Sequence, residues 1–171
     1  MKYHDKQKGF NVIELMIAIF ILGVVIVGFY EIAVLSLKIL QENEHEIEAA
    51  YLAEEGVEAV RSIRDTVNWI DAGDGQTGPG ELDIDSIDTY YPIISGGNWE
   101  LATVDPGVIE NIFSRKVVFE KVSRDPVTGD IEAAYNDSRK DADSLKFSVI
   151  VSWMERDVNK NVTLVTLITN F

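Results

Sequence analysis

The chain has 171 residues and a formal net charge of −14, and it contains no cysteine. Disulfide bonds, thiol catalysis and zinc–thiolate sites are therefore excluded. The composition is 46% hydrophobic and 26% charged, which is not that of a disordered chain, and the excess of acidic residues disfavours binding to nucleic acid.

The N-terminal segment combines a basic start with a long apolar run. Residues 1–9 hold three lysines against one aspartate, a net charge of +2, so the rest of the chain carries −16. The 21 residues Phe10–Tyr30 would span roughly 31 Å as a helix, near the thickness of a bilayer core. Positive charge before such a helix tends to stay in the cytoplasm. We therefore predict a single-pass protein of the cytoplasmic membrane, in contact with its lipid, with a cytoplasmic N-terminus and an extracytoplasmic head.

Two simple interpretations leave part of this segment unexplained. A cleavable secretory signal has an apolar stretch of about 7–15 residues and a small-residue cleavage site, whereas this run is longer and no A-x-A sequence follows it. A plain membrane anchor accounts for the length and the lysines, but it gives no reason for Glu14. One alternative is that Glu14 lies near the cytoplasmic interface and reaches back to water at little cost.

Residues 8–16, KGFNVIELM, resemble the processing signature of type IV prepilins and the related pseudopilins. That signature is a short basic leader ending in glycine, then an aromatic residue, a glutamate at the fifth position after the cut, and an apolar helix. Here Lys8 and Gly9 end the leader, Phe10 follows, and Glu14 stands at the required position. The resemblance covers about residues 6–35 and is only architectural beyond them.

The resemblance implies that a prepilin peptidase removes the leader 1–9 by cutting between Gly9 and Phe10, and that Phe10 is then N-methylated. It also implies assembly with other pilin or pseudopilin subunits by an inner-membrane platform, into a cell-surface or periplasmic filament. There the charged Phe10 amine of one subunit can pair with Glu14 of its neighbour and set the axial register. Pairing within one chain is the alternative, because residues four apart share a helix face.

The helix is expected to continue well past the apolar run. Residues 31–65 contain no proline and are rich in Glu, Ala and Leu, which are good helix formers. We predict one helix from about Asn11 to about Asp65, with 10–30 in the membrane or filament core and 31–67 as an amphipathic continuation. Apolar spacing predicts that one face packs on the head: Leu40, Ile47, Ala50, Ala53, Val57, Val60 and Ile63.

One departure from the family pattern bears on the kind of subunit. Major pilins often carry a proline just past the apolar run, but here Glu31 stands near that place and no proline occurs before Pro79. This favours a minor pilin or minor pseudopilin, which would initiate, cap or modify a filament built mainly of another subunit.

The rest of the chain predicts a variable loop region over 68–97 and an antiparallel β-sheet head over 98–171. Strands are expected at 98–104, 115–122, 131–135, 144–154 and 161–171, and the last two read as a hairpin. A sheet of four or five strands packed on the helix gives an α+β, pilin-like fold. Core packing is expected for Trp69, Trp99 and Trp153, with an adhesive surface as the alternative.

No enzymatic activity and no cofactor are expected. His4 lies in the leader and His45 on a helix face expected to be exposed, so neither a catalytic triad nor a histidine metal site has enough histidines. Acidic loops could bind calcium, although none has EF-hand spacing and solvated loops are the alternative. The weak calcium candidates are Asp71, Asp74, Asp83, Asp85 and Asp88, with Asp137, Asp141 and Asp143 in a second loop.

Two functions therefore remain open. The first is a structural subunit of a type IV pilus-like or type II secretion-like filament. The second is a membrane-anchored extracytoplasmic binding or adhesion domain that never polymerises. Glu14 separates them, because its replacement should abolish assembly of a filament subunit but be neutral in a plain anchor.

Overall fold

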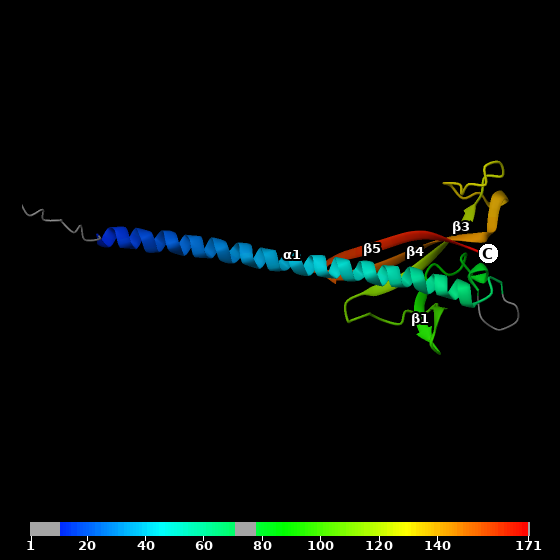
Figure 1. Ribbon diagram of the computed structural model, residues 1–171, viewed down its shortest axis with the longest axis horizontal. Helices are drawn as coiled ribbons and strands as arrows, with labels where there is room; N and C mark the ends of the chain where they lie inside the picture. The colour runs from blue at the N-terminus through cyan, green and yellow to red at the C-terminus, as the bar shows by residue number, and fades with distance from the viewer. Residues whose placement is uncertain (1–10, 71–77, 171) are drawn as a thin grey trace, which may run out of the picture. The chain divides into compact units, whose positions relative to one another are not determined.

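The computed structural model describes residues 11–70 and 78–170. The processing residues Lys8, Gly9 and Phe10 and the calcium candidates Asp71 and Asp74 lie outside these ranges. The chain divides into two compact units that meet between Glu44 and His45. Its described part contains one long helix, α1 (Val12–Thr66), followed by antiparallel β-sheets, which confirms the predicted α+β, pilin-like architecture (Figure 1).

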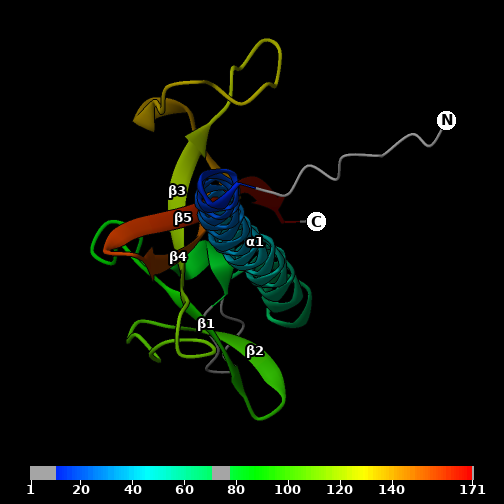
Figure 2. The same ribbon diagram turned by 90° about the vertical axis from the view of Figure 1, so that its left-hand side faces the viewer.

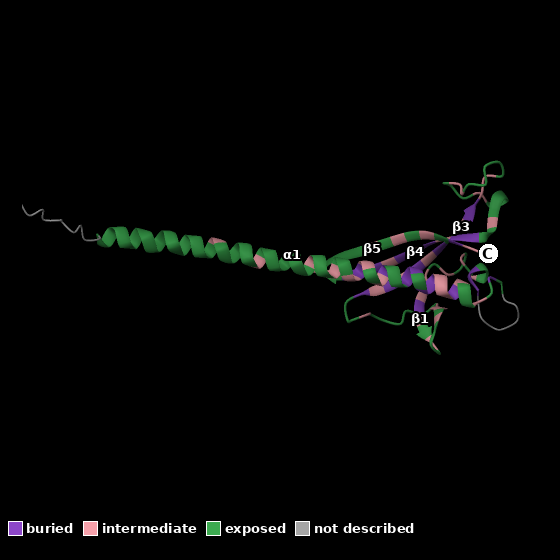
Figure 3. Cartoon of the chain, in the orientation of Figure 1, coloured by how far each residue is buried: buried purple, intermediate pink, exposed green. Residues whose placement is uncertain are grey.

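The helix α1 begins and ends within one residue of the predicted limits. It has no proline, and it continues through Gly23 and Gly28. Large apolar side chains between Val12 and Leu40 are exposed on all sides, as the green colour of this part in Figure 3 shows. A helix that is apolar all round is stable only in apolar surroundings, so this part requires a membrane or other helices around it.

The second part of α1 is amphipathic, as predicted, but the buried face differs in part from the expected one. Its buried residues are Ala49, Ala53, Gly56, Val57, Ala59, Val60 and Ile63. The predictions for Leu40 and Ile47 are wrong, because their side chains are 62% and 57% exposed, and Ala50 is only half-buried. From Ala49 onward the buried residues recur mostly every three or four positions, as expected for one face of a helix. Ile47 lies off that face.

The strands form two antiparallel sheets. Strands β3 (Ser114–Ser123), β4 (Lys140–Glu155) and β5 (Val158–Thr169) pair in the order β3-β4-β5. Strands β1 (Tyr91–Ser95) and β2 (Asn98–Ala102) form a separate hairpin, which Figure 2 shows beside the larger sheet. An isolated bridge between Tyr90 and Val117 links this hairpin to β3. Two short 3₁₀ helices complete the described elements, η1 (Pro79–Glu81) and η2 (Asp137–Arg139).

Three sequence predictions about the sheet are therefore wrong. A single sheet of four or five strands is not formed, and β1 lies in the 68–97 region, where no strand was expected. Residues 131–135 are not a strand either, since they contribute only the bridge between Arg124 and Ile131. Gly96 and Gly97, with φ values of 58° and 90°, form the turn between β1 and β2, so this hairpin has a local signal in the sequence. For residues 131–135 the outcome depends on a strand partner, which tertiary packing decides.

The core of the head lies between the buried face of α1 and one face of the β3-β4-β5 sheet. Phe147, Val149 and Val151 are fully buried and Trp153 is 5% exposed, which confirms the alternation predicted for this strand. Trp69 is also buried, and its indole N–H donates a hydrogen bond of 3.1 Å to the carbonyl of Ala142. Trp99 is only half-buried, so the core prediction holds for two of the three tryptophans.

The predicted hairpin of the last two strands is confirmed, and its turn carries backbone strain. Arg156 and Asp157 connect β4 to β5 with φ values of 48° and 64°. We expect Asp157→Gly to raise the free energy of unfolding by about 1 kcal/mol, because glycine adopts positive φ without a Cβ clash. Gly97→Ala, at φ 90° in the β1–β2 turn, should lower it. Thermal unfolding of the full chain in detergent measures both, and shifts of the same sign would contradict this explanation.

Candidate functional site

Glu14 lies in the first turn of α1, where the helix end itself favours a carboxylate. The first backbone hydrogen bond runs from the Leu15 amide to the Asn11 carbonyl, over 3.2 Å. Amides of the first turn have no partner within the helix, so this end carries a partial positive charge. Asn11 followed three residues later by Glu14 also has the spacing of a capping box. A role of Glu14 in contacts between subunits must therefore be distinguished from this local role at its own helix end.

The surroundings of Glu14 are otherwise apolar. Its neighbours Ile13, Leu15 and Ile17 are more than half exposed, and Glu14 is the only charged residue between Val12 and Tyr30. A carboxylate placed among apolar side chains and away from water is costly unless a cation pairs with it. The first basic residue along α1 is Lys38, more than six turns away. A partner for Glu14 must therefore come from the chain before α1 or from another molecule.

The helix also meets the requirement for anchoring in a membrane. Within residues 11–70 and 78–170, α1 is the one helix that is long and apolar enough to cross a bilayer. No residue of its most apolar stretch is buried. Together, an acidic first turn, an all-round apolar helix and an antiparallel β head are consistent with membrane anchoring and with a pilin-like architecture.

Comparison with known protein families supports the same class. Residues 4–30 match the prokaryotic N-terminal methylation motif, so the chain carries the type IV prepilin signature. The match implies a pilin-like structural subunit that a prepilin peptidase processes and that assembles with pilin subunits. It covers the N-terminal segment and not the head. No curated protein and no solved structure matches the chain.

His45 was expected on an exposed helix face, and the structure corrects this. Its side chain is 31% exposed, and its Nδ1 lies 3.7 Å from Oε1 of Glu155. The ring meets Phe113 edge-on, with 6.1 Å between the ring centroids. His45 precedes Ala49 by one helical turn and so lies on the buried face of α1. It therefore takes part in the packing of the helix on the sheet.

The described acidic calcium candidates do not converge on a common point. Asp83 accepts a hydrogen bond of 3.2 Å from the Ser86 amide, Asp85 pairs with Lys121, and Asp88 is exposed. In the second loop, Asp137 accepts a hydrogen bond of 2.9 Å from the Tyr135 hydroxyl. The part of the chain that the structure describes holds no group of three or more His, Cys, Asp or Glu side chains placed to bind a metal ion.

Asp141 instead belongs to an ion-pair network that ties the long β3–β4 connection to the sheet. Arg124 donates through Nε to Asp141, through one amino group to the Gly129 carbonyl at 2.9 Å, and through the other to Ser144 Oγ at 3.0 Å. Burial by itself raises the pKa of Asp141, but hydrogen bonds with Ser144, Arg124 and the Asp143 amide hold that pKa below its usual range. The network therefore stabilises the charged form of Asp141.

This network predicts a loss of stability in acid. A carboxyl whose pKa is lowered by folding stabilises the protein above its unfolded pKa, about 3.9, and loses that contribution as pH falls through the folded pKa. We expect Asp141→Asn to be less stable than wild type at pH 7, with a difference that shrinks below about pH 4. Unfolding by denaturant at pH 7, 4 and 3 measures this. An equal difference at all three values would contradict the role of the Asp141 charge.

Proposed function

We propose that the protein is a minor pilin or pseudopilin, a structural subunit of a type IV pilus-like or type II secretion-like filament. The observation that carries this proposal is the methylation motif at residues 4–30, with Glu14 in the first turn of an exposed, all-round apolar helix. An apolar helix of this kind suits two successive environments, the lipid bilayer before assembly and a bundle of apolar helix segments from other subunits after it.

In this proposal cleavage creates the partner that Glu14 lacks. Cutting between Gly9 and Phe10 converts the amide nitrogen of Phe10 into an amine, which remains charged after N-methylation. When subunits pack with an axial stagger, the Phe10 amine of one subunit lies against Glu14 of its neighbour. Apolar contacts between the helices do not favour one axial position, whereas this ion pair does. The ion pair therefore sets the axial register of the helices.

The continuity of α1 supports a minor rather than a major role. The helix runs unbroken from Val12 to Thr66, and no proline interrupts it. A helix without a proline keeps the backbone hydrogen bond that a proline would remove, so α1 lacks that kind of break. Such a subunit suits a cap or an initiator, where one copy contacts neighbours of another kind.

The experiment that tests the proposal is the mass of the N-terminal peptide of the protein purified from its native membrane. A chain that begins at N-methylated Phe10 supports processing and filament entry. A chain that still begins at Met1 beside an active prepilin peptidase would overturn the proposal and leave the anchored, non-polymerising domain. A cleavage-blocked Gly9→Arg variant provides the reference mass for the unprocessed protein.

A further inference from the structure

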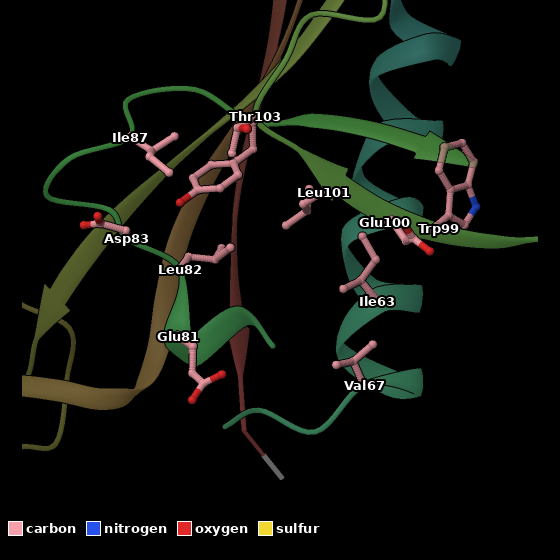
Figure 4. A pocket seen from close by; sticks show the side chains of 11 residues that line it. Ile63, Val67, Glu81, Leu82, Asp83, Ile87, Trp99, Glu100, Leu101 and Thr103 are labelled. Carbon is pink, nitrogen blue, oxygen red and sulfur yellow. The ribbon is translucent and has the colours of Figure 1, made fainter. Parts of the chain in front are cut away.

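The head contains a hollow that the filament role does not use. It has a volume of about 450 Å³ and lies between the end of α1, the η1 segment and strand β2. Figure 4 shows Ile63, Leu82 and Leu101 pointing into the same space from these three elements. Its size is within the range of about 300–1,000 Å³ typical of small-molecule sites. Its lining combines apolar and polar side chains in similar measure.

The charged side chains that line this hollow are all acidic. Glu81, Asp83 and Glu100 contribute to its lining, and no lysine, arginine or histidine does so among the described residues. Tyr90 also lines the hollow. Burial of its hydroxyl, and then the charge of Asp83, raise the pKa of Tyr90. That hydroxyl is buried and has no hydrogen-bond partner within the described residues. The hollow therefore combines apolar side chains with a negative rim.

Trp99 lines one end of the hollow, and its ring already makes a cation–π contact. The Arg115 guanidinium lies 5.5 Å from the centroid of the Trp99 ring and lines a second, smaller hollow rather than this one. Arg115 is also held by the Leu52 carbonyl and by Glu55. Its charge is thus engaged elsewhere, and the rim acids Glu81, Asp83 and Glu100 make no ion pair within the described residues.

We propose that this hollow binds a small organic amine: a ligand with an apolar body and one positive charge. The apolar body would lie against Ile63, Leu82 and Leu101, and the ammonium group would lie at the rim near Asp83, across the hollow from Glu100 (Figure 4). The site concerns the head alone and is independent of filament assembly.

The test compares three probes that share a phenylethyl group and differ only in the polar group at its end, which is positive, neutral or negative. Phenethylamine, 2-phenylethanol and 3-phenylpropionate are titrated by calorimetry into the full chain in a nonionic detergent. We expect the amine to bind about fivefold more tightly than the alcohol, since exposed charge pairs contribute modestly, and the carboxylate not to bind. The preference for the amine should weaken with added salt, whereas alcohol binding should not change.

A charge-neutralised variant shows where the amine binds. Glu81→Gln, Asp83→Asn and Glu100→Gln together should reduce amine binding to the level of the alcohol. The control carries the same charge change on exposed helix positions, Glu44→Gln, Glu46→Gln and Glu54→Gln, and should bind the amine as wild type does. The control also corrects for partition of the probes into detergent. Equal binding of amine and carboxylate, or equal losses in both triple variants, would overturn the proposal.

A second binding experiment, with a peptide, distinguishes a free amine from a basic protein segment as the ligand of the hollow. Acetyl-Gly-Phe-Lys-Gly-amide presents the same phenyl group and ammonium group on a peptide backbone, and its Glu analogue is the control. Binding of phenethylamine with rim-dependent affinity supports the proposal whether or not the peptide also binds. Binding of the lysine peptide without binding of phenethylamine would overturn it and assign the hollow to a basic protein segment.

Discussion

Replacing Glu14 by glutamine is expected to abolish incorporation of the protein into filaments while leaving membrane insertion and processing intact. Glutamine has almost the same shape as glutamate and occupies the same capping-box position after Asn11, so the local helix start is preserved. The negative charge is lost, and the proposed partner amine of Phe10 is then left unpaired in apolar surroundings. Removing one member of a buried ion pair costs about 3–5 kcal/mol, or at least a hundredfold in incorporation.

The measurement is the amount of the subunit in sheared or purified filaments relative to the amount in the membrane. Glu31→Gln is the matched control, because Glu31 lies on the same helix and is also exposed, but outside the first turn. Its incorporation should match wild type. If Glu14→Gln is incorporated normally and Glu14→Ala is not, Glu14 acts by capping its own helix, and the intersubunit role is wrong.

Enlarging Gly56 is expected to have the largest effect on the stability of the head. Gly56 lies on the buried face of α1, and a Cβ added there would approach Val149 Cγ1 to 2.6 Å and Arg115 Cδ to 3.2 Å. Val149 is fully buried on the central strand β4, so it has little room to move. Overpacking of this kind typically costs about 1–3 kcal/mol, and we expect Gly56→Val to lie at the upper end.

A double-mutant cycle isolates the contact. Gly56→Ala gains about 1 kcal/mol of helix propensity, but the clash costs more than this gain. Its net effect in wild type should therefore be destabilising. In a Val149→Ala background only the approach to the flexible Arg115 side chain remains, and Gly56→Ala should then stabilise the head by up to about 1 kcal/mol. Denaturant unfolding of the four full-length chains followed by tryptophan fluorescence measures the cycle. Equal effects of Gly56→Ala in both backgrounds would show that helix–sheet packing at this position is not tight.

Features that depend on neighbouring residues in the chain were predictable from the sequence. The basic leader, Gly9, Phe10 and Glu14 form a contiguous motif, and its match to the methylation signature needs no tertiary contact. The limits of α1 follow from helix propensity and the absence of proline, and the buried face of β4 follows from strict alternation through Phe147 and Trp153. In each case the period of the backbone repeats within a few residues.

Features that depend on which segments meet were decided by the tertiary structure. The phase of the buried face of α1 excludes Ile47 and includes His45, because the sheet covers the helix only along one line. The bridge between Tyr90 and Val117 and the pairing of Asp141 with Arg124 bring together residues that are separated in sequence. A run of acidic residues looks the same whether its charges are solvated, paired or gathered around a hollow, since burial and charge partners are properties of the packed chain.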